Sequence, residues 1–161
     1  MGLANVSASG NSLQKTGGCA GCPDASAASA QTGSAMQFTA SETGTLRYIG
    51  LGTGGVGTQP NDIGFAWRLQ GNTAEVRELG AYRTETPFAT GDVLQITADS
   101  SGAKYWKNGV VVYASASPAG QAVRVLAVIY DVNATLNNIM VQTGSAATAA
   151  ADAGTARIKR R

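Results

Sequence analysis

Cys19 and Cys22, which are separated by two residues, have the most reactive side chains in this sequence. A Cys-x-x-Cys pair can exchange electrons in a thioredoxin-like setting, or it can supply two ligands of a zinc site. The first needs a strand-helix-strand unit, which the surrounding residues do not suggest. The second needs two more ligands, and because the chain has no other cysteine and no histidine, they would come from a second molecule. We therefore expect a local disulfide that stiffens a glycine-rich loop in an oxidising location outside the cytoplasm, with two free thiols as the alternative.

The composition gives little support to acid–base or nucleophilic catalysis. The absence of histidine excludes Ser-His-Asp and Cys-His machinery and histidine-bound metals. Glu75 and Glu78 are three residues apart, so on a strand their side chains point to opposite faces and cannot act together as acid and nucleophile. We expect no catalytic residues, no enzymatic activity and no metal site.

Trp106 and Tyr113 are the aromatic side chains best placed to contact a ligand. They lie on either side of an Asn-Gly dipeptide, a strong hairpin signal because both central residues of a type I′ turn need a positive φ. In a regular hairpin Trp106 faces Val111 and Lys104 faces Tyr113, which places these four residues on one face. Both faces of the hairpin carry apolar groups, so two alternatives remain. The aromatic face is either an exposed platform for a sugar ring or is buried under a loop, a tail or a neighbouring chain.

Residues 62–70 are expected to form an alternating strand. The side chains expected to face the core are Ile63, Phe65, Trp67 and Leu69. Those on the opposite face are Asp62, Gly64, Ala66 and Arg68. Small residues between two charged ones could form a shallow trough where a ligand approaches the backbone, or an ordinary solvated face with a weak ion pair.

The remaining sequence is a series of short expected strands separated by turn residues. Residues 91–115 contain three of them, at 92–98, 103–107 and 110–115. Others are expected at 3–9, 12–16, 35–41, 45–52, 73–79, 82–85, 123–130 and 135–142. Residues 17–35 are small and polar, and we expect a loop there with one weak strand near 28–31. About twelve strands at this regular spacing, with no helical pattern, indicate an all-β antiparallel sandwich or barrel.

The length of 161 residues is typical of one domain with a tail. We place the domain in residues 1–142 and an Ala-rich, flexible linker or tail in residues 143–161. The net charge is +2, and the basic excess lies at the end of that tail, in Arg157, Lys159, Arg160 and Arg161. We therefore expect no nucleic-acid binding by the body, and no membrane insertion, because no apolar run is long enough for a transmembrane helix.

Two patterns within residues 91–115 resemble those of a known group of proteins. A strand that begins GDVLQI, with a Gly-Asp pair before alternating apolar residues, is followed by the hairpin YWKNGVVV. With the segments GNSLQKTGG, MQFTASETGTLRYIGL and ATLNNI, residues 3–142 resemble the concanavalin A-like lectin/glucanase superfamily. This superfamily includes laminin-G-like and SPRY-like domains, among them modules of bacterial surface proteins.

The resemblance implies a jelly roll of two curved sheets, with the concave face or the rim loops as the binding surface. It also implies that Tyr105 and Val112 point inward, which would leave Trp106 and Tyr113 on an outer surface. Hydrolases of this superfamily carry paired acids as E-x-D-x-x-E or E-x-D-x-E on one strand, a pattern that this sequence lacks. Calcium is the one cofactor left open. Its candidate loop ligands are scattered, at Asp62, Asp92, Asp131 and Asn133.

We expect a non-catalytic, lectin-like module of a larger secreted or cell-surface protein, which binds a carbohydrate or another surface polymer. Sugar rings would stack on exposed aromatic side chains while polar side chains hold their hydroxyl groups. The expected contact residues are Trp106, Tyr113, Tyr82, Arg68, Asp62 and Asn133. The alternative is a structural subunit of a surface layer, fibre or phage particle, in which the sandwich faces and the tails mediate self-association.

Overall fold

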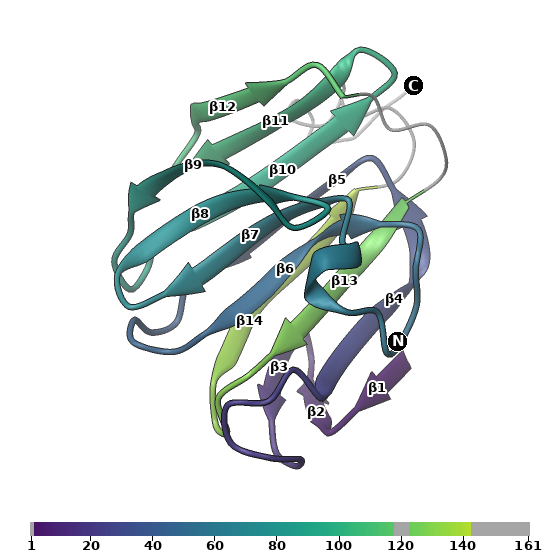
Figure 1. Ribbon diagram of the computed structural model, residues 1–161, viewed down its shortest axis with the longest axis vertical. Helices are drawn as coiled ribbons and strands as arrows, with labels where there is room; N and C mark the ends of the chain where they lie inside the picture. The colour runs from purple at the N-terminus through teal and green to yellow at the C-terminus, as the bar shows by residue number, and fades with distance from the viewer. Residues whose placement is uncertain (1, 118–122, 143–161) are drawn as a thin grey trace.

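The computed structural model describes residues 2–117 and 123–142, which form two antiparallel sheets of seven strands each, packed face to face (Figure 1). The front sheet has the order β1 (Gly2–Ala4), β4 (Ala25–Gly33), β13 (Val123–Ile129), β6 (Arg47–Gly52), β7 (Phe65–Gln70), β8 (Thr73–Glu78) and β9 (Ala81–Pro87). The back sheet has the order β12 (Val110–Ser115), β11 (Gly102–Lys107), β10 (Val93–Asp99), β5 (Ala35–Thr39), β14 (Thr135–Gln142), β3 (Ser12–Lys15) and β2 (Val6–Ser9). The expected all-β, two-sheet sandwich is confirmed, although the described residues form 14 strands rather than about twelve.

The first expected strand, residues 3–9, is in fact two strands. Asn5 has a φ of 58°, a left-handed conformation that interrupts the extended backbone. Before it, β1 pairs with β4 in the front sheet, and after it, β2 pairs with β3 in the back sheet. The N-terminal segment therefore contributes a strand to each layer.

The expected loop over residues 17–35 is wrong for its second half. Residues 25–33 form β4, a nine-residue strand between β1 and β13 whose first five residues are buried. Alanine and serine have low β-propensity, so the sequence suggested only a weak strand near residues 28–31. The neighbouring strands on both sides, rather than its own side chains, hold β4 extended.

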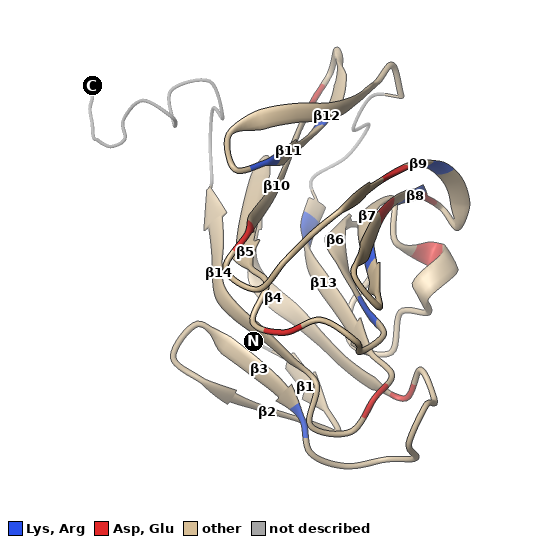
Figure 2. Cartoon of the chain, turned by 90° about the vertical axis from the view of Figure 1, so that its left-hand side faces the viewer, with Lys and Arg blue, Asp and Glu red and all other residues tan. Residues whose placement is uncertain are grey.

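The main core lies between the two sheets. Figure 2 shows the sheets from the side, with charged positions in strands of both. Trp67 is fully buried there, as expected, and its ring meets that of Tyr105 edge-to-face at 5.6 Å between centroids. Other fully buried members are Phe38, Ile49, Leu51, Leu69, Leu94, Ile96 and Leu136.

A second, smaller apolar cluster covers the outer face of the front sheet. It is made of Ala28, Tyr48, Ile63, Ala66, Leu126 and Val128. Neither alternative for the face of Asp62, Gly64, Ala66 and Arg68, a shallow trough or a solvated face, describes its centre, because Ala66 is fully buried in this cluster. Pro60–Asp62 forms a short 3₁₀ helix, η1, so β7 begins only at Phe65 and Ile63 packs on the opposite side of the sheet from Phe65.

The expected linker or tail, residues 143–161, lies outside the described residues. Over residues 2–117 and 123–142, no helix has the length and apolar character needed to cross a membrane.

Candidate functional site

The outer face of the back sheet carries one row of neutral side chains across four neighbouring strands. Along β10 and β5, residues that point into the core alternate with Gln95 and Gln37, which point outward. The strand register places Trp106 opposite Gln95, Gln95 opposite Gln37, and Gln37 opposite Met140. We call Trp106, Gln95, Gln37 and Met140 the Trp106 row.

An open groove of about 600 Å³ runs beside one end of this row. Its lining includes Trp106, Gln95, Thr97, Lys104 and Gln142. The partly buried indole of Trp106 donates a hydrogen bond to the Thr97 hydroxyl at 3.2 Å, which fixes the ring against the sheet. An aromatic surface beside amide and hydroxyl groups can hold a ligand that has both apolar faces and hydroxyl groups.

Tyr113 does not share this face, which corrects the register expected for the hairpin. The two central turn residues have positive φ values, 51° at Asn108 and 83° at Gly109, as the Asn-Gly signal predicts. A β-bulge follows, so that Trp106 faces Val111 as expected but Tyr113 faces Tyr105 rather than Lys104. The extra residue in the bulged strand reverses the alternation of faces. Tyr113 therefore packs against the main core, with its ring centroid 6.0 Å from that of Tyr105.

Arg68 and Tyr82 lie on the other side of the molecule, on the outer face of the front sheet. They belong to a connected series of ion pairs and ring contacts. In it the Glu75 carboxylate pairs with Arg68 at 3.3 Å and with Arg77 at 2.6 Å. The Arg77 guanidinium lies 5.4 Å from the centroid of the Tyr82 ring. Tyr82 is half exposed and its hydroxyl donates to Glu85, whose carboxylate raises the pKa of Tyr82.

The last two expected contact residues are in two further places. Asp62 is an exposed residue of η1, and Asn133 lies in the turn between β13 and β14 with a φ of 70°. The Asn133 carbonyl accepts a hydrogen bond from the Gln14 side chain at 3.2 Å. The six residues expected to bind a ligand are therefore not brought together, and the structure gathers different neighbours around Trp106.

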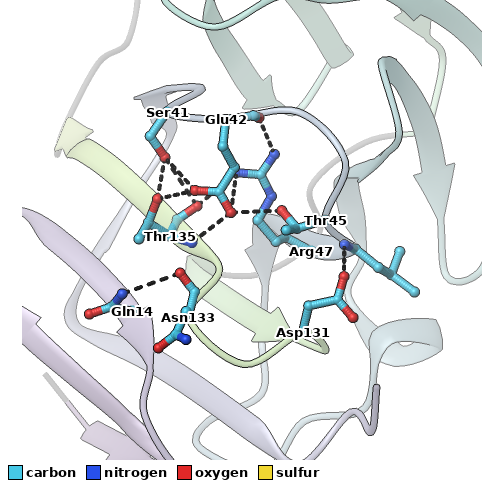
Figure 3. A network of polar contacts seen from close by, with 9 residues as sticks. Gln14, Ser41, Glu42, Thr45, Arg47, Asp131, Asn133 and Thr135 are labelled. Atoms are coloured by element: carbon cyan, nitrogen blue, oxygen red, sulfur yellow. Dashed lines mark hydrogen bonds and ion pairs between the residues drawn. The ribbon is translucent and has the colours of Figure 1, made fainter. Parts of the chain in front are cut away.

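A polar network that sequence inspection missed joins the turn after β5 to the start of β14 (Figure 3). The fully buried Arg47 side chain donates to the carbonyl oxygens of Thr135 at 2.7 Å and Glu42 at 2.9 Å. Burial alone would raise the pKa of Glu42, but hydrogen bonds from Thr135 and Thr45 outweigh it and hold that pKa below its ordinary value. An arginine at a buried position of the expected strand 45–52 was the available signal. The network ties the turn to the strand through these bonds, although the buried Arg47 Nε has no hydrogen-bond partner among the described residues.

A second network surrounds Lys15, whose side chain is fully buried. Its ammonium group, with three N–H donors, lies within hydrogen-bond distance of four acceptors, the carbonyl oxygens of Cys19 at 2.6 Å, Cys22 at 2.9 Å and Tyr130 at 2.7 Å and the Asp24 carboxylate at 2.8 Å. Cys19 and Cys22 form a disulfide in this loop. The hydrogen bond from Lys15, with one from the Cys19 amide, lowers the pKa of Asp24.

No protein-family model matches the sequence, and no curated protein matches it either. Solved structures do match over most of the chain. A human SPRY domain is 12% identical with a TM-score of 0.63, over 90% of this chain and 100% of that one. The carbohydrate-binding module CBM66 of Bacillus subtilis is 12% identical with a TM-score of 0.54, over 87% of this chain and 92% of that one. An alginate lyase of polysaccharide lyase family 7 is 14% identical with a TM-score of 0.54, over 83% of this chain and 69% of that one.

These likenesses define the class of protein by its fold. The chain has a concanavalin A-like jelly-roll fold, as the resemblance of residues 3–142 predicted. At 12–14% identity they establish the fold alone, and among these three matches are both a binding module and an enzyme.

Proposed function

We propose that this protein is a non-catalytic carbohydrate-binding module that holds its ligand against the outer face of the back sheet. The observation that carries the proposal is the Trp106 row, in which a fixed, partly buried indole stands beside two outward-pointing glutamines at the edge of an open groove. The likeness to CBM66, a carbohydrate-binding module, supports the proposal because the same fold serves that purpose there.

The row suits an uncharged oligosaccharide. The apolar face of a sugar ring would stack on Trp106, and the side-chain amides of Gln95 and Gln37 can each donate to and accept from hydroxyl groups. The row spans three strand-to-strand steps, which is roughly 14 Å at the usual spacing of sheets and is longer than a single ring. Among the described residues that line the groove, the charged ones are Lys104 and Asp99, and neither of them belongs to the Trp106 row.

The position of the two glutamates supports a role without catalysis. Glu75 is on the outer face of the front sheet, where Arg68 and Arg77 hold it. Glu78 is buried between the sheets and accepts hydrogen bonds from the Tyr105 and Ser115 hydroxyls, each at 3.0 Å. The two carboxylates therefore point away from each other and cannot flank one glycosidic bond.

Glycan-array screening followed by calorimetry tests the proposal. Trp106→Ala should weaken binding of a hit at least about tenfold, because it removes the stacking surface, whereas Tyr82→Ala on the other sheet should leave the affinity unchanged. Equal affinities of the Trp106 variant and the unmodified protein would contradict the proposed site. Turnover of the bound glycan would contradict the non-catalytic role.

Self-association is the second candidate function, and the edge strand β12 favours it. Val110 is 68% and Val111 43% exposed on this edge, where β12 pairs with β11 on one side and with no other strand of the described residues on its outer side. If the chain is an assembly subunit of a surface layer, fibre or virion, light scattering should show oligomers that grow with concentration and are lost in Val111→Lys.

A carbohydrate-binding role would fit a module of a secreted or cell-surface protein.

A further inference from the structure

The loop between β3 and β4 keeps its shape through contacts that do not depend on the disulfide. The Lys15 ammonium group binds the carbonyl oxygens of both cysteines, at 2.6 Å and 2.9 Å. The Cys19 amide donates to the Asp24 carboxylate at 2.9 Å, and the Gly21 amide to the Tyr130 carbonyl at 2.9 Å. Since the Lys15 side chain is fully buried, its own hydrogen bonds are partly shielded from water, whereas the bond from the Cys19 amide to Asp24 lies at the surface. The loop should therefore hold Cys19 and Cys22 side by side after the bond between their sulfurs is reduced.

A third potential ligand lies beside the two sulfurs. One carboxylate oxygen of Asp24 and the Sγ atoms of Cys19 and Cys22 all lie within 4.8 Å of one another. Gly18 permits this approach: it has a φ of 81°, and a Cβ there would lie 2.5 Å from the Asp24 carboxylate. The sequence indicated only the two cysteines as ligands. Asp24 is added by the fold of the loop, which brings its carboxylate to the sulfurs.

The local charge suits a divalent cation. In the oxidised loop Lys15 and Asp24 neutralise each other at 2.8 Å. A dithiol reductant supplies two electrons and two protons, which convert the disulfide into two thiols, and the reductant is itself oxidised to a disulfide. A divalent cation that displaces those two protons forms two metal–thiolate bonds, which leaves the local net charge unchanged.

We propose that the reduced loop binds one thiophilic divalent cation of the zinc class through Cys19, Cys22 and Asp24. Three protein ligands leave the fourth tetrahedral position for water. The same loop would then be closed by a disulfide in an oxidising compartment and by a metal ion in a reducing one. This inference is independent of the carbohydrate site, which lies on a different part of the molecule.

Titration of the reduced protein with Cd²⁺ tests the proposal, since cadmium–thiolate bonds absorb in the ultraviolet. We expect saturation at one equivalent, release of about two protons per metal near neutral pH, and displacement of Cd²⁺ by excess Zn²⁺. The oxidised protein and Cys22→Ser should lack the absorption band; the Lys15 bonds use the backbone carbonyl of Cys22, so this variant should keep its fold. A missing band in the reduced protein, or an unchanged band in Cys22→Ser, would overturn the proposal.

Two further measurements separate a prepared site from two adjacent thiols. Unfolding the reduced protein in guanidinium chloride should weaken Cd²⁺ binding at least tenfold, as should Asp24→Asn in the folded protein, checked by circular dichroism. Asp99→Asn, an exposed carboxylate on β10, is the matched control and should bind Cd²⁺ normally. Equal affinity of the folded and unfolded chains would refute the prepared site. If Asp24→Asn does not fold, Asp24→Glu serves in its place, and an affinity like that of the unfolded chain would support Asp24 as a positioned ligand.

Discussion

Single buried polar residues tie distant parts of this sandwich together. Lys15 on β3 donates a hydrogen bond to the Tyr130 carbonyl, and Arg47 on β6 donates one to the Thr135 carbonyl. Glu78 on the front sheet accepts hydrogen bonds from Tyr105 and Ser115 on the back sheet. Removing one partner of a buried, paired charge leaves the other group uncompensated, which is strongly destabilising. At the residue scale, these groups are therefore the places where one substitution should have the largest effect on stability.

Lys15→Met should lower the free energy of unfolding by about 3 kcal/mol, because it leaves a carboxylate and three carbonyl oxygens without their shared donor. Urea denaturation measures the change. Lys104→Met removes an exposed lysine from β11 and should stay within about 0.5 kcal/mol of the unmodified protein. A Lys15 variant as stable as this control would show that the ammonium group contributes little.

Tyr105 should make stability depend on alkaline pH. Burial, with a contribution from Glu78, raises the pKa of Tyr105 above its ordinary value of 10.0. The unfolded chain then releases this proton more readily than the folded one, so the stabilisation is complete below pH 10 and is lost as the pH rises further. Tyr105→Phe should reduce the fall in unfolding free energy above about pH 10 by up to about 1.4 kcal/mol per pH unit. Equal slopes in chemical denaturation between pH 9 and 11 would contradict this.

At the scale of elements, close approach of strands depends on residues without side chains. Gly50 lies in β6 between β7 and β13, and a Cβ at this position would lie 1.9 Å from the carbonyl oxygen of Phe65. The Arg47–Gly52 strand can therefore pair on both sides only if this position has no side chain.

Gly50→Ala should destabilise the protein by about 3 kcal/mol, because β6 and β7 must separate to admit the methyl group. Gly55→Ala is the matched control: its Cβ would meet no atom within 4 Å, and its stability should change by less than about 0.5 kcal/mol. Thermal unfolding of the two variants makes the comparison, and similar midpoints would argue against the tight β6–β7 contact.

At the scale of the whole molecule, the two tryptophans report on opposite environments. Trp67 is fully buried between the sheets and donates to the Gln95 carbonyl at 3.3 Å, whereas Trp106 stands on the outer face at the groove. One fluorophore therefore reports on the core and the other on the proposed binding surface.

Iodide should quench only part of the tryptophan fluorescence, and Trp106→Phe should remove the quenchable part. A bound oligosaccharide should protect Trp106, because it covers the indole. Full quenching in the Trp106 variant would place Trp67 in contact with solvent and contradict the packing of the core.

Much of the architecture could be predicted because it depends on short-range patterns. The Asn-Gly turn, the strand at residues 110–115 and the burial of Trp67 were predicted from local alternation and turn chemistry. β4 was predicted only as a weak strand near residues 28–31, because its small residues carry no such pattern. The alternating strand expected over residues 62–70 is wrong at its start, because a 3₁₀ turn ends at Asp62 and β7 begins only at Phe65.

The sequence by itself determined an all-β chain of antiparallel strands and hairpins, since alternation and positive φ values at turns are properties of neighbouring residues. Only the tertiary structure decided which side chains meet. A one-residue bulge separates Tyr113 from Trp106, and the strand register aligns Trp106 with Gln95 and Gln37. These arrangements arise because partners far apart in the chain must satisfy buried polar groups and fill one core together, which no local pattern encodes.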